Sequence, residues 1–374
     1  MKTAMVLIAS LIVIGAVGAD RDAVSLREEF GAYFLIGSAL NNEQILGQDQ
    51  ASLEFIAHHF NALTAENAMK WARIHPTEDS YNWRYADALT AFARQNSIQV
   101  TGHTLIWHRQ TPDWVFQDHA AQAVSRDVLL ARMESHIRNV VGRYKGVVHS
   151  WDVVNEALNE DGTLRDSRWR NIIGDDYIQK AFEFAHQADP DARLYYNDFN
   201  MYSPAKRAGA IELVRRVRQS GVPVHGIGMQ AHYSLDSPSN LSDIENSIVA
   251  FSNEGLDVMI TELDVSVLPS PGEAQAYDDK FDPYVNALPD SVARAFEARY
   301  LDFMRIFLAH SDQISRITFW GVHDAQSWKN NWPMRGRTDY PLLFDRDNQP
   351  KPVIAELIAL KNRIRDERDL PAIR

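Results

Sequence analysis

A β-rich, largely apolar run ends on an amide and a carboxylic acid side by side in the stretch Val148-His149-Ser150-Trp151-Asp152-Val153-Val154-Asn155-Glu156-Ala157-Leu158. A second run of the same design is Asp257-Val258-Met259-Ile260-Thr261-Glu262-Leu263-Asp264. Each run predicts a buried strand that delivers a glutamate at its carboxyl end. One such glutamate alone would be read as a helix N-terminal charge or a solvated loop residue, because charged side chains are mostly exposed. Two of them predict a pair of carboxylates facing one another across a cleft.

Strands and helices alternate along the whole chain. Strands are predicted at 34–39, 61–66, 99–103, the opening stretch, 194–198, 226–232, 257–262 and 315–320. Helical spacing of apolar residues occupies 53–60, 84–95, 126–144, 177–188, 205–219, 241–253, 291–309 and 353–362. Short apolar strands joined by helical crossovers must be parallel, and eight of them close without leaving an edge. The predicted fold class is therefore α/β, a single (β/α)8 TIM barrel that covers residues 20–374.

The composition is that of a globular protein, with 45% hydrophobic and 24% charged residues among 374. The net charge of −12 argues against a nucleic-acid partner, because basic patches supply most of that affinity. There is no Cys for disulfide or thiolate chemistry. Residues 1–19 read as a secretory signal peptide, with an uncleaved anchor as the alternative. The mature protein is expected to be a monomer, extracellular or periplasmic, and free of the membrane.

A parallel barrel places its site at the carboxyl ends of its strands. Polar and aromatic side chains gather at these positions in this sequence. They are Glu66, Asn67, Lys70 and Trp71 after the second strand, His103, Trp107 and His108 after the third, Asn155 and Glu156 after the fourth, Gln230 and His232 after the sixth, Glu262 and Asp264 after the seventh, and Trp320, Asp324 and Trp328 after the eighth. No single residue in this set is specific, but their convergence predicts a site.

These runs resemble one known family. The motifs are Glu-Asn-Ala-Met-Lys-Trp, Gly-His-Thr-Leu-Ile-Trp-His, Trp-Asp-Val-Val-Asn-Glu-Ala, Gly-Met-Gln-Ala-His, Ile-Thr-Glu-Leu-Asp and Phe-Trp-Gly-Val-His-Asp with Ser-Trp. In this order they are similar to the endo-1,4-β-xylanases (EC 3.2.1.8) of glycoside hydrolase family 10. The resemblance covers roughly residues 25 to 365, and a string of ordered motifs is far more specific than any one of them.

The resemblance implies a retaining hydrolase in which Glu156 is the general acid/base and Glu262 the nucleophile. Such an enzyme needs its two carboxyl groups about 5–5.5 Å apart, so that one attacks the anomeric carbon while the other protonates the leaving oxygen. His232 resembles the family's histidine that hydrogen-bonds the nucleophile, and its alternative is a structural histidine. Asn155 resembles the amide that binds the sugar's 2-hydroxyl, and its alternative is a helix cap.

The family's glycone-side sugar contacts are matched by Glu66, Asn67, Lys70, His103, Trp107, Gln230, Trp320 and Trp328. Indole rings suit the apolar faces of pyranose rings. In family members the last two also crowd the place of a hexose hydroxymethyl group, so the resemblance implies a preference for xylose. Any of these Trp residues could instead be core, and Trp71, Trp151 and Trp169 are left unassigned. Asp264 and Asp324 are expected to support other residues.

No cofactor or metal is predicted. His103 and His108 are five residues apart on a strand and loop, not four apart on a helix as in a zinc site. The run Asp345-Arg346-Asp347-Asn348 lacks the Gly and distal Glu of a calcium loop. The expected substrate is xylan or a xylo-oligosaccharide. Two alternatives stay open: a hydrolase specialised for short or decorated xylo-oligosaccharides, and a carbohydrate-binding barrel without catalysis.

Overall fold

A single parallel sheet of nine strands organises the computed structural model of this protein, which describes residues 24–272 and 276–369. The predicted signal peptide lies outside the described residues. The strands are β1 (Leu35–Leu40), β2 (Ala62–Ala65), β3 (Gln99–Trp107), β4 (Ser150–Asn155), β5 (Arg193–Asp198), β6 (Gly226–Met229), β7 (His232–Ser234), β8 (Asp257–Ser266) and β9 (Ile314–Phe319).

Eight of these strands close into a ring. Neighbours along the chain pair from β1 to β6, β6 pairs directly with β8, and β9 returns to β1, with every pairing parallel. A closed ring leaves no strand edge to be covered. The predicted (β/α)8 TIM barrel is therefore confirmed, and β7 is a short extension that pairs with the far end of β8.

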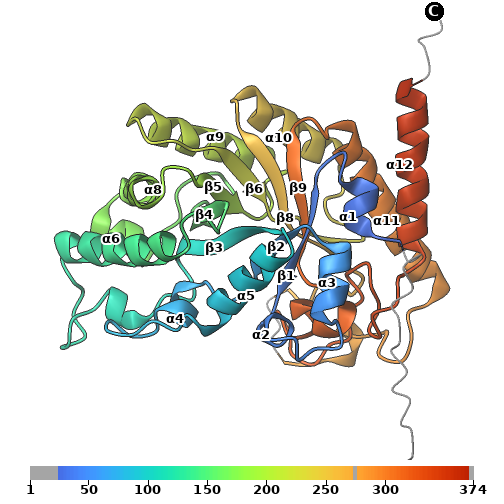
Figure 1. The fold of residues 1–374 in the computed structure, drawn as a ribbon, viewed down its shortest axis with the longest axis horizontal. Coiled ribbons are helices and arrows are strands. Elements are labelled where there is room, and N and C mark those ends of the chain that lie inside the picture. The colour runs from blue at the N-terminus through green and yellow to red at the C-terminus, as the bar shows by residue number, and fades with distance from the viewer. Residues whose placement is uncertain (1–23, 273–275, 370–374) are drawn as a thin grey trace, which may run out of the picture.

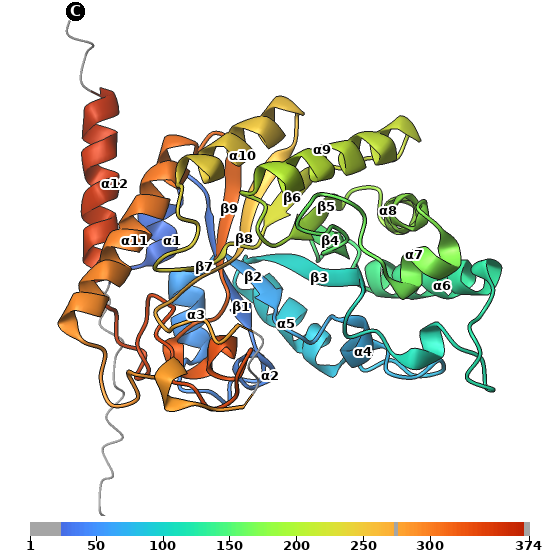
Figure 2. The same ribbon diagram turned by 180° about the vertical axis from the view of Figure 1, so that it is seen from behind.

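Helices surround the barrel (Figures 1 and 2). They are α1 (Leu26–Phe30), α2 (Asn42–Ile45), α3 (Leu53–His59), α4 (Trp71–Ile74), α5 (Arg84–Gln95), α6 (Arg126–Arg143), α7 (Arg168–Ile173), α8 (Tyr177–Ala188), α9 (Pro204–Gln219), α10 (Ser242–Asn253), α11 (Asp290–Ala309) and α12 (Val353–Asp369). Single 3-10 turns occur at η1 (Asp113–Val115), η2 (Asp279–Phe281), η3 (Asp324–Gln326) and η4 (Trp328–Asn330). Both views place α12 at the outer edge of the molecule, beside α11.

One predicted strand is broken, and two others run four residues beyond their predicted carboxyl ends. The sixth, predicted as 226–232, is broken at Gln230 and Ala231 into β6 and β7, because Ala231 has a left-handed backbone with φ 62°. The third continues to Trp107 and the seventh to Ser266, because both stay paired beyond their polar residues. These differences lie at the carboxyl ends, where the barrel carries its polar side chains.

The core holds the three tryptophans that the sequence left unassigned. Trp71, Trp151 and Trp169 are buried in the apolar cluster between barrel and helices. Their burial agrees with the core alternative for these residues.

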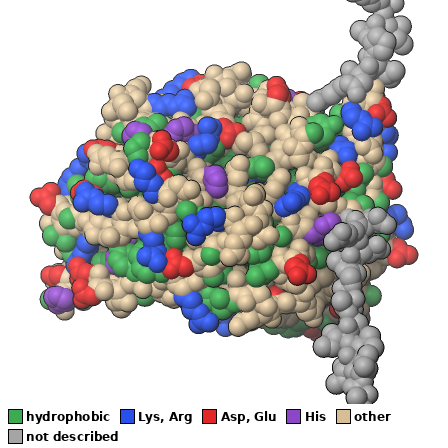
Figure 3. All heavy atoms as spheres, viewed as in Figure 1, with side chains coloured by type: hydrophobic (Ala, Val, Ile, Leu, Met, Phe, Trp, Pro, Cys, Tyr) green, Lys and Arg blue, Asp and Glu red, His purple; other side chains and the backbone are tan. Residues whose placement is uncertain are grey.

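Charged side chains of both signs are interspersed on the face shown in Figure 3. None of the helices in residues 24–272 and 276–369 combines the length and the apolarity that a membrane crossing needs.

Candidate active site

A cleft opens at the carboxyl ends of the barrel strands, with a volume of about 560 Å³. All twelve residues that the sequence predicts for the site line it. They are Glu66, Asn67, Lys70, His103, Trp107, Asn155, Glu156, Gln230, His232, Glu262, Trp320 and Trp328. The cleft therefore joins residues from six barrel strands and the loops that follow them.

Glu156 follows β4 in a left-handed backbone conformation, with φ 56°. This conformation is unfavourable for a residue with a Cβ atom and persists only where the surroundings hold it. Its backbone N–H donates to Asn197 O on β5 at 2.9 Å. Its carboxylate accepts from Trp107 Nε1 at 2.9 Å and from Gln230 Nε2 at 3.0 Å. Asn155 Nδ2 also donates to this carboxylate, at 3.3 Å, so the turn directs the carboxyl group into the cleft, where three donors hold it.

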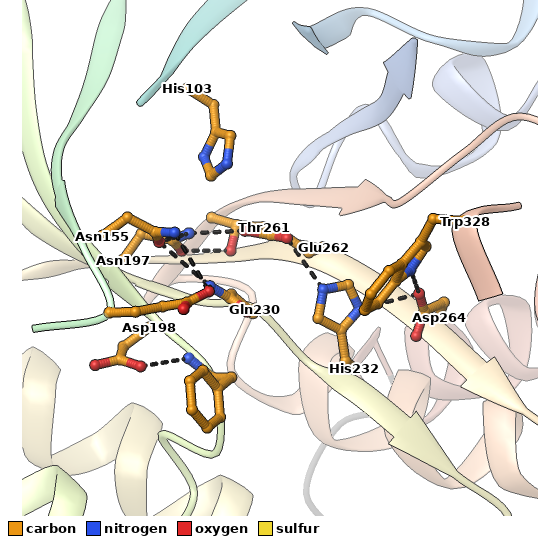
Figure 4. A network of polar contacts seen from close by, with 12 residues as sticks. His103, Asn155, Asn197, Asp198, Gln230, His232, Thr261, Glu262, Asp264 and Trp328 are labelled. Carbon is orange, nitrogen blue, oxygen red and sulfur yellow. Dashed lines mark hydrogen bonds and ion pairs between the residues drawn. The ribbon is translucent and has the colours of Figure 1, made fainter. Parts of the chain in front are cut away.

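Glu262 lies within β8, with 4% of its surface exposed. Its two carboxylate oxygens have different partners: Asn197 Nδ2 donates to one at 2.8 Å, and His232 Nε2 contacts the other at 3.0 Å. The other ring nitrogen of His232 contacts Asp264 at 2.9 Å. The Asp264 carboxylate also accepts a hydrogen bond from Trp328 Nε1 at 2.8 Å. Asp264 thus orients both the histidine and a cleft tryptophan (Figure 4).

Side-chain amides connect the two glutamates across the barrel (Figure 4). Asn155 Oδ1 accepts from Asn197 Nδ2 at 3.0 Å and from Gln230 Nε2 at 3.2 Å. The first of these amides also donates to Glu262, and the second to Glu156. Three amides therefore join the two carboxylates in one continuous network, which fixes their relative position. Asn155 is the last residue of β4 and is followed by a loop, not by a helix. It is therefore not a helix cap.

Residues 25–360 match the model of glycosyl hydrolase family 10. The chain belongs to this family. Among its relatives, endo-1,4-beta-xylanase A of Xylanibacter ruminicola is 46% identical over 94% of this chain and 96% of its own length. The endo-1,4-beta-xylanase of Geobacillus stearothermophilus is 43% identical over 89% of this chain and 98% of its own.

Solved family 10 structures share the fold. A GH10 endoxylanase from a sugarcane soil metagenome superposes with a TM-score of 0.87 at 40% identity, covering 90% of this chain and 99% of the other. A mutant structure in complex with xylotriose reaches a TM-score of 0.83 at 36% identity, with the same shares of the two chains covered.

Charge in this family 10 site is balanced around His232. Burial alone would lower the pKa of His232, but Asp264 and Glu262 raise it to about 9. Burial alone would raise the pKa of Glu262, but the hydrogen bond from His232 and the charges nearby hold it below the ordinary value. Burial would likewise raise the pKa of Asp264, but the positive charge of His232 and its hydrogen bond help to hold this pKa below the ordinary value. At neutral pH the arrangement is a cation between two carboxylates.

Lys70 brings a second cation to the cleft, between two aromatic rings. Its ammonium lies 4.9 Å from the centre of the Trp107 ring and 5.9 Å from that of Trp320, and it donates to Asn67 Oδ1 at 3.2 Å. Burial lowers the pKa of Lys70, while the carboxylates around it oppose that shift. Asn67 in turn donates to Glu66 at 3.0 Å. This side of the cleft offers hydrogen-bonding groups between flat rings, as a sugar chain requires.

Sequence reasoning missed five lining residues: Arg109, Gln110, Phe199, Asn200 and Trp332. Phe199 and Asn200 follow β5, so the strand-end rule could have found them. Arg109 and Gln110 continue the loop after β3. Trp332 lies in the long segment after β9, 48% exposed, and no local signal distinguishes it.

Within the described part of the chain, no three His, Cys, Asp or Glu residues are arranged to hold an ion. His103 instead contacts Asp152 at 2.9 Å, where both side chains are buried in the barrel.

Proposed function

We propose that this chain is a retaining endo-1,4-β-xylanase that cleaves internal bonds of xylan, with Glu262 as nucleophile and Glu156 as general acid/base. The network that joins the two carboxylates from opposite strands carries this proposal. Relatives named as endo-1,4-beta-xylanases, and a related structure in complex with xylotriose, support the substrate class.

The surroundings of Glu262 suit a nucleophile. A nucleophile must be ionised, and the cationic His232 keeps the pKa of Glu262 low despite burial. Attack on the anomeric carbon forms a glycosyl-enzyme bond as the bond to the leaving oxygen breaks. The proton that this oxygen needs comes from Glu156, which then removes a proton from the water that hydrolyses the intermediate.

A Glu262→Ala variant tests the nucleophile. We expect xylan hydrolysis to fall by about 10⁴-fold or more, because no intermediate can form. Glu245→Ala on α10 is the matched control, since its partner is His310, which does not line the cleft. Near-normal hydrolysis by the Glu262 variant would refute the assignment, and absence of reducing-sugar release by the wild type would favour the non-catalytic alternative.

The acid role of Glu156 is tested by leaving-group dependence. Glu156→Ala is expected to lose most activity on xylan and little on aryl xylosides whose leaving groups depart without a proton. Equal losses on both substrates would refute the acid role.

Polymer and oligosaccharide preference remain separate hypotheses. Product profiles on xylan and on xylohexaose discriminate them: a mixture of internal fragments from the polymer supports the endo-acting proposal, whereas turnover of the hexaose alone favours the specialised alternative.

We also propose that residues 1–19 are a cleaved signal peptide, and that residues 20–374 form one secreted, monomeric catalytic barrel free of the membrane. The charged start and apolar run before the small residues at 17–19 support it. N-terminal sequencing of secreted protein, expected to start at Asp20, and its mass in solution test both parts.

A further inference from the structure

A fully buried ion pair lies behind Glu156, on the side of the barrel away from His232. Lys206 Nζ, from α9, lies 2.9 Å from Asp198 Oδ1 at the end of β5, and both side chains are 0% exposed. Figure 4 shows Asp198 on the side of Asn155 and Gln230, with His232 and Trp328 opposite. Burying two charges is unfavourable unless their mutual attraction and further hydrogen bonds compensate for the lost hydration. The other partners of this pair are therefore informative.

Those partners hold the backbone that follows Glu156. Asp198 Oδ2 accepts from the Leu158 N–H at 3.4 Å and from the Tyr196 hydroxyl. The Tyr196 oxygen accepts from the Ala157 N–H at 3.0 Å. The two amides directly after the acid/base residue are thus both bound to this group on β5.

The same backbone carries the strained residue of the site. With φ 56°, Glu156 is in a conformation that is unfavourable for a residue with a Cβ atom and persists only because its neighbours enforce it. Its own N–H is bound by Asn197 O and its carbonyl by Arg165 Nε at 3.0 Å. The next two backbone N–H groups donate to Tyr196 and Asp198. These two side chains therefore complete the set of hydrogen bonds that hold the turn.

We propose that Tyr196, Asp198 and Lys206 are positioning residues for the acid/base step, holding the turn after β4 so that the Glu156 carboxyl group faces the leaving oxygen. This inference rests on the acid/base role proposed for Glu156. Lys206 acts through Asp198: its positive charge favours the ionised carboxylate, which accepts the hydrogen bonds from Leu158 and Tyr196. Burial raises the pKa of Asp198 to about 6 even with Lys206 beside it, and loss of that cation would raise the pKa further.

A direct charge effect on Glu156 is the competing explanation for any change at Lys206. Charged and titratable groups face Glu156 from several elements: Lys70, His108, Arg165, Asp198 and Glu262. Substituting Lys206 alters this balance as well as the turn. Substituting Tyr196 by Phe removes the hydroxyl that binds the turn and leaves the Lys206 cation in place, so it separates release of the turn from loss of that cation.

The test compares Tyr196→Phe and Lys206→Met on two aryl β-xylobiosides. The phenyl glycoside needs its leaving oxygen protonated, whereas the 2,4-dinitrophenyl glycoside does not. We expect kcat/KM of both variants to fall about 10- to 100-fold on the phenyl glycoside, within the range of general acid catalysis, and less than about 3-fold on the dinitrophenyl glycoside. Lys361→Met is the matched control, because this buried lysine of α12 pairs with Glu29 of α1 and neither residue lines the cleft.

The Tyr196→Phe result decides the proposal, even if the Lys206→Met variant does not fold. Equal losses on the two glycosides, or no loss, would overturn it, and so would the same selective loss in Lys361→Met. A selective loss in Lys206→Met alone would assign the effect to charge and would also overturn positioning. Glu156→Ala on the same substrates keeps the two hypotheses apart. If it lacks the selective loss, the acid role itself is wrong; if it shows the loss and Tyr196→Phe does not, only the positioning is wrong.

Discussion

His232 lies between two carboxylates, and its protonation therefore depends on the fold. Its pKa is about 9 in the folded protein, above the ordinary value of 6.5, because Asp264 and Glu262 outweigh burial. A group that binds its proton more tightly when folded stabilises the protein wherever that proton is bound. The stabilisation is full below about pH 6.5 and is lost as pH rises through about 9.

Replacing His232 by Asn should remove this dependence. We expect the difference in unfolding free energy between wild type and His232→Asn to shrink by of the order of 2–3 kcal/mol between roughly pH 6 and pH 9.5. Urea titrations of both proteins at the two pH values measure it. If the difference in unfolding free energy between the two proteins is the same at both pH values, His232 is neutral in the folded protein.

At the scale of single residues, chemistry could be predicted from the sequence better than geometry. The twelve residues that the family resemblance implied for the site line one cleft, because parallel strands all end at the same rim. Asn197 was read only as part of a strand, although it contacts both Asn155 and Glu262. Left-handed backbone at Glu156 and Ala231 was not foreseen either, since it arises from tertiary contacts and not from residue type.

At the scale of elements, β6 shows how a glycine within a strand makes room for a side chain of the neighbouring strand. A methyl group on Gly228 would come 2.3 Å from Asn197 Oδ1 and 2.9 Å from Thr261 Cγ2. Asn197 can occupy its place beside Glu262 only because this position is glycine. The strand pattern predicted β6, but the reason for the glycine is visible only once β5 lies beside it.

A Gly228→Ala substitution should therefore damage the site more than its size suggests. We expect a stability loss of about 1–3 kcal/mol from overpacking, and a loss in kcat/KM because the amide that donates to Glu262 is displaced. Thermal unfolding and xylan kinetics measure the two effects. Gly142→Ala in α6 is the control: nothing lies within 4 Å of its added methyl group, so activity should persist with stability equal or higher by about 0.5–1 kcal/mol. Unchanged activity in Gly228→Ala would mean that Asn197 tolerates displacement.

On the scale of the whole molecule, α1 and α12, the first and last helices of the described chain, are in contact, and neither contributes a residue to the cleft. α12 packs on α11, and Lys361 Nζ donates to the backbone carbonyl of Glu29 in α1 at 3.1 Å. The closed barrel needs no cover for a strand edge, so α12 serves to bury apolar surface rather than to complete the sheet. A substitution in the buried face of α12 should therefore lower the stability of the protein without changing its catalytic rate.

Leu357 offers the test of that separation. It is 0% exposed within α12, so Leu357→Ala should cost about 2–5 kcal/mol of unfolding free energy through lost burial and the cavity left behind. At 25 °C, where the variant remains folded, kcat/KM on xylan should stay at the wild-type value, because no described residue of α12 lines the cleft. Glu356→Ala, exposed on the same helix turn, should change stability by less than about 0.5 kcal/mol. A fall in kcat/KM for folded Leu357→Ala would mean that the packing of this helix reaches the carboxyl ends of the strands, and the barrel would then have to be treated as one mechanical unit with its site.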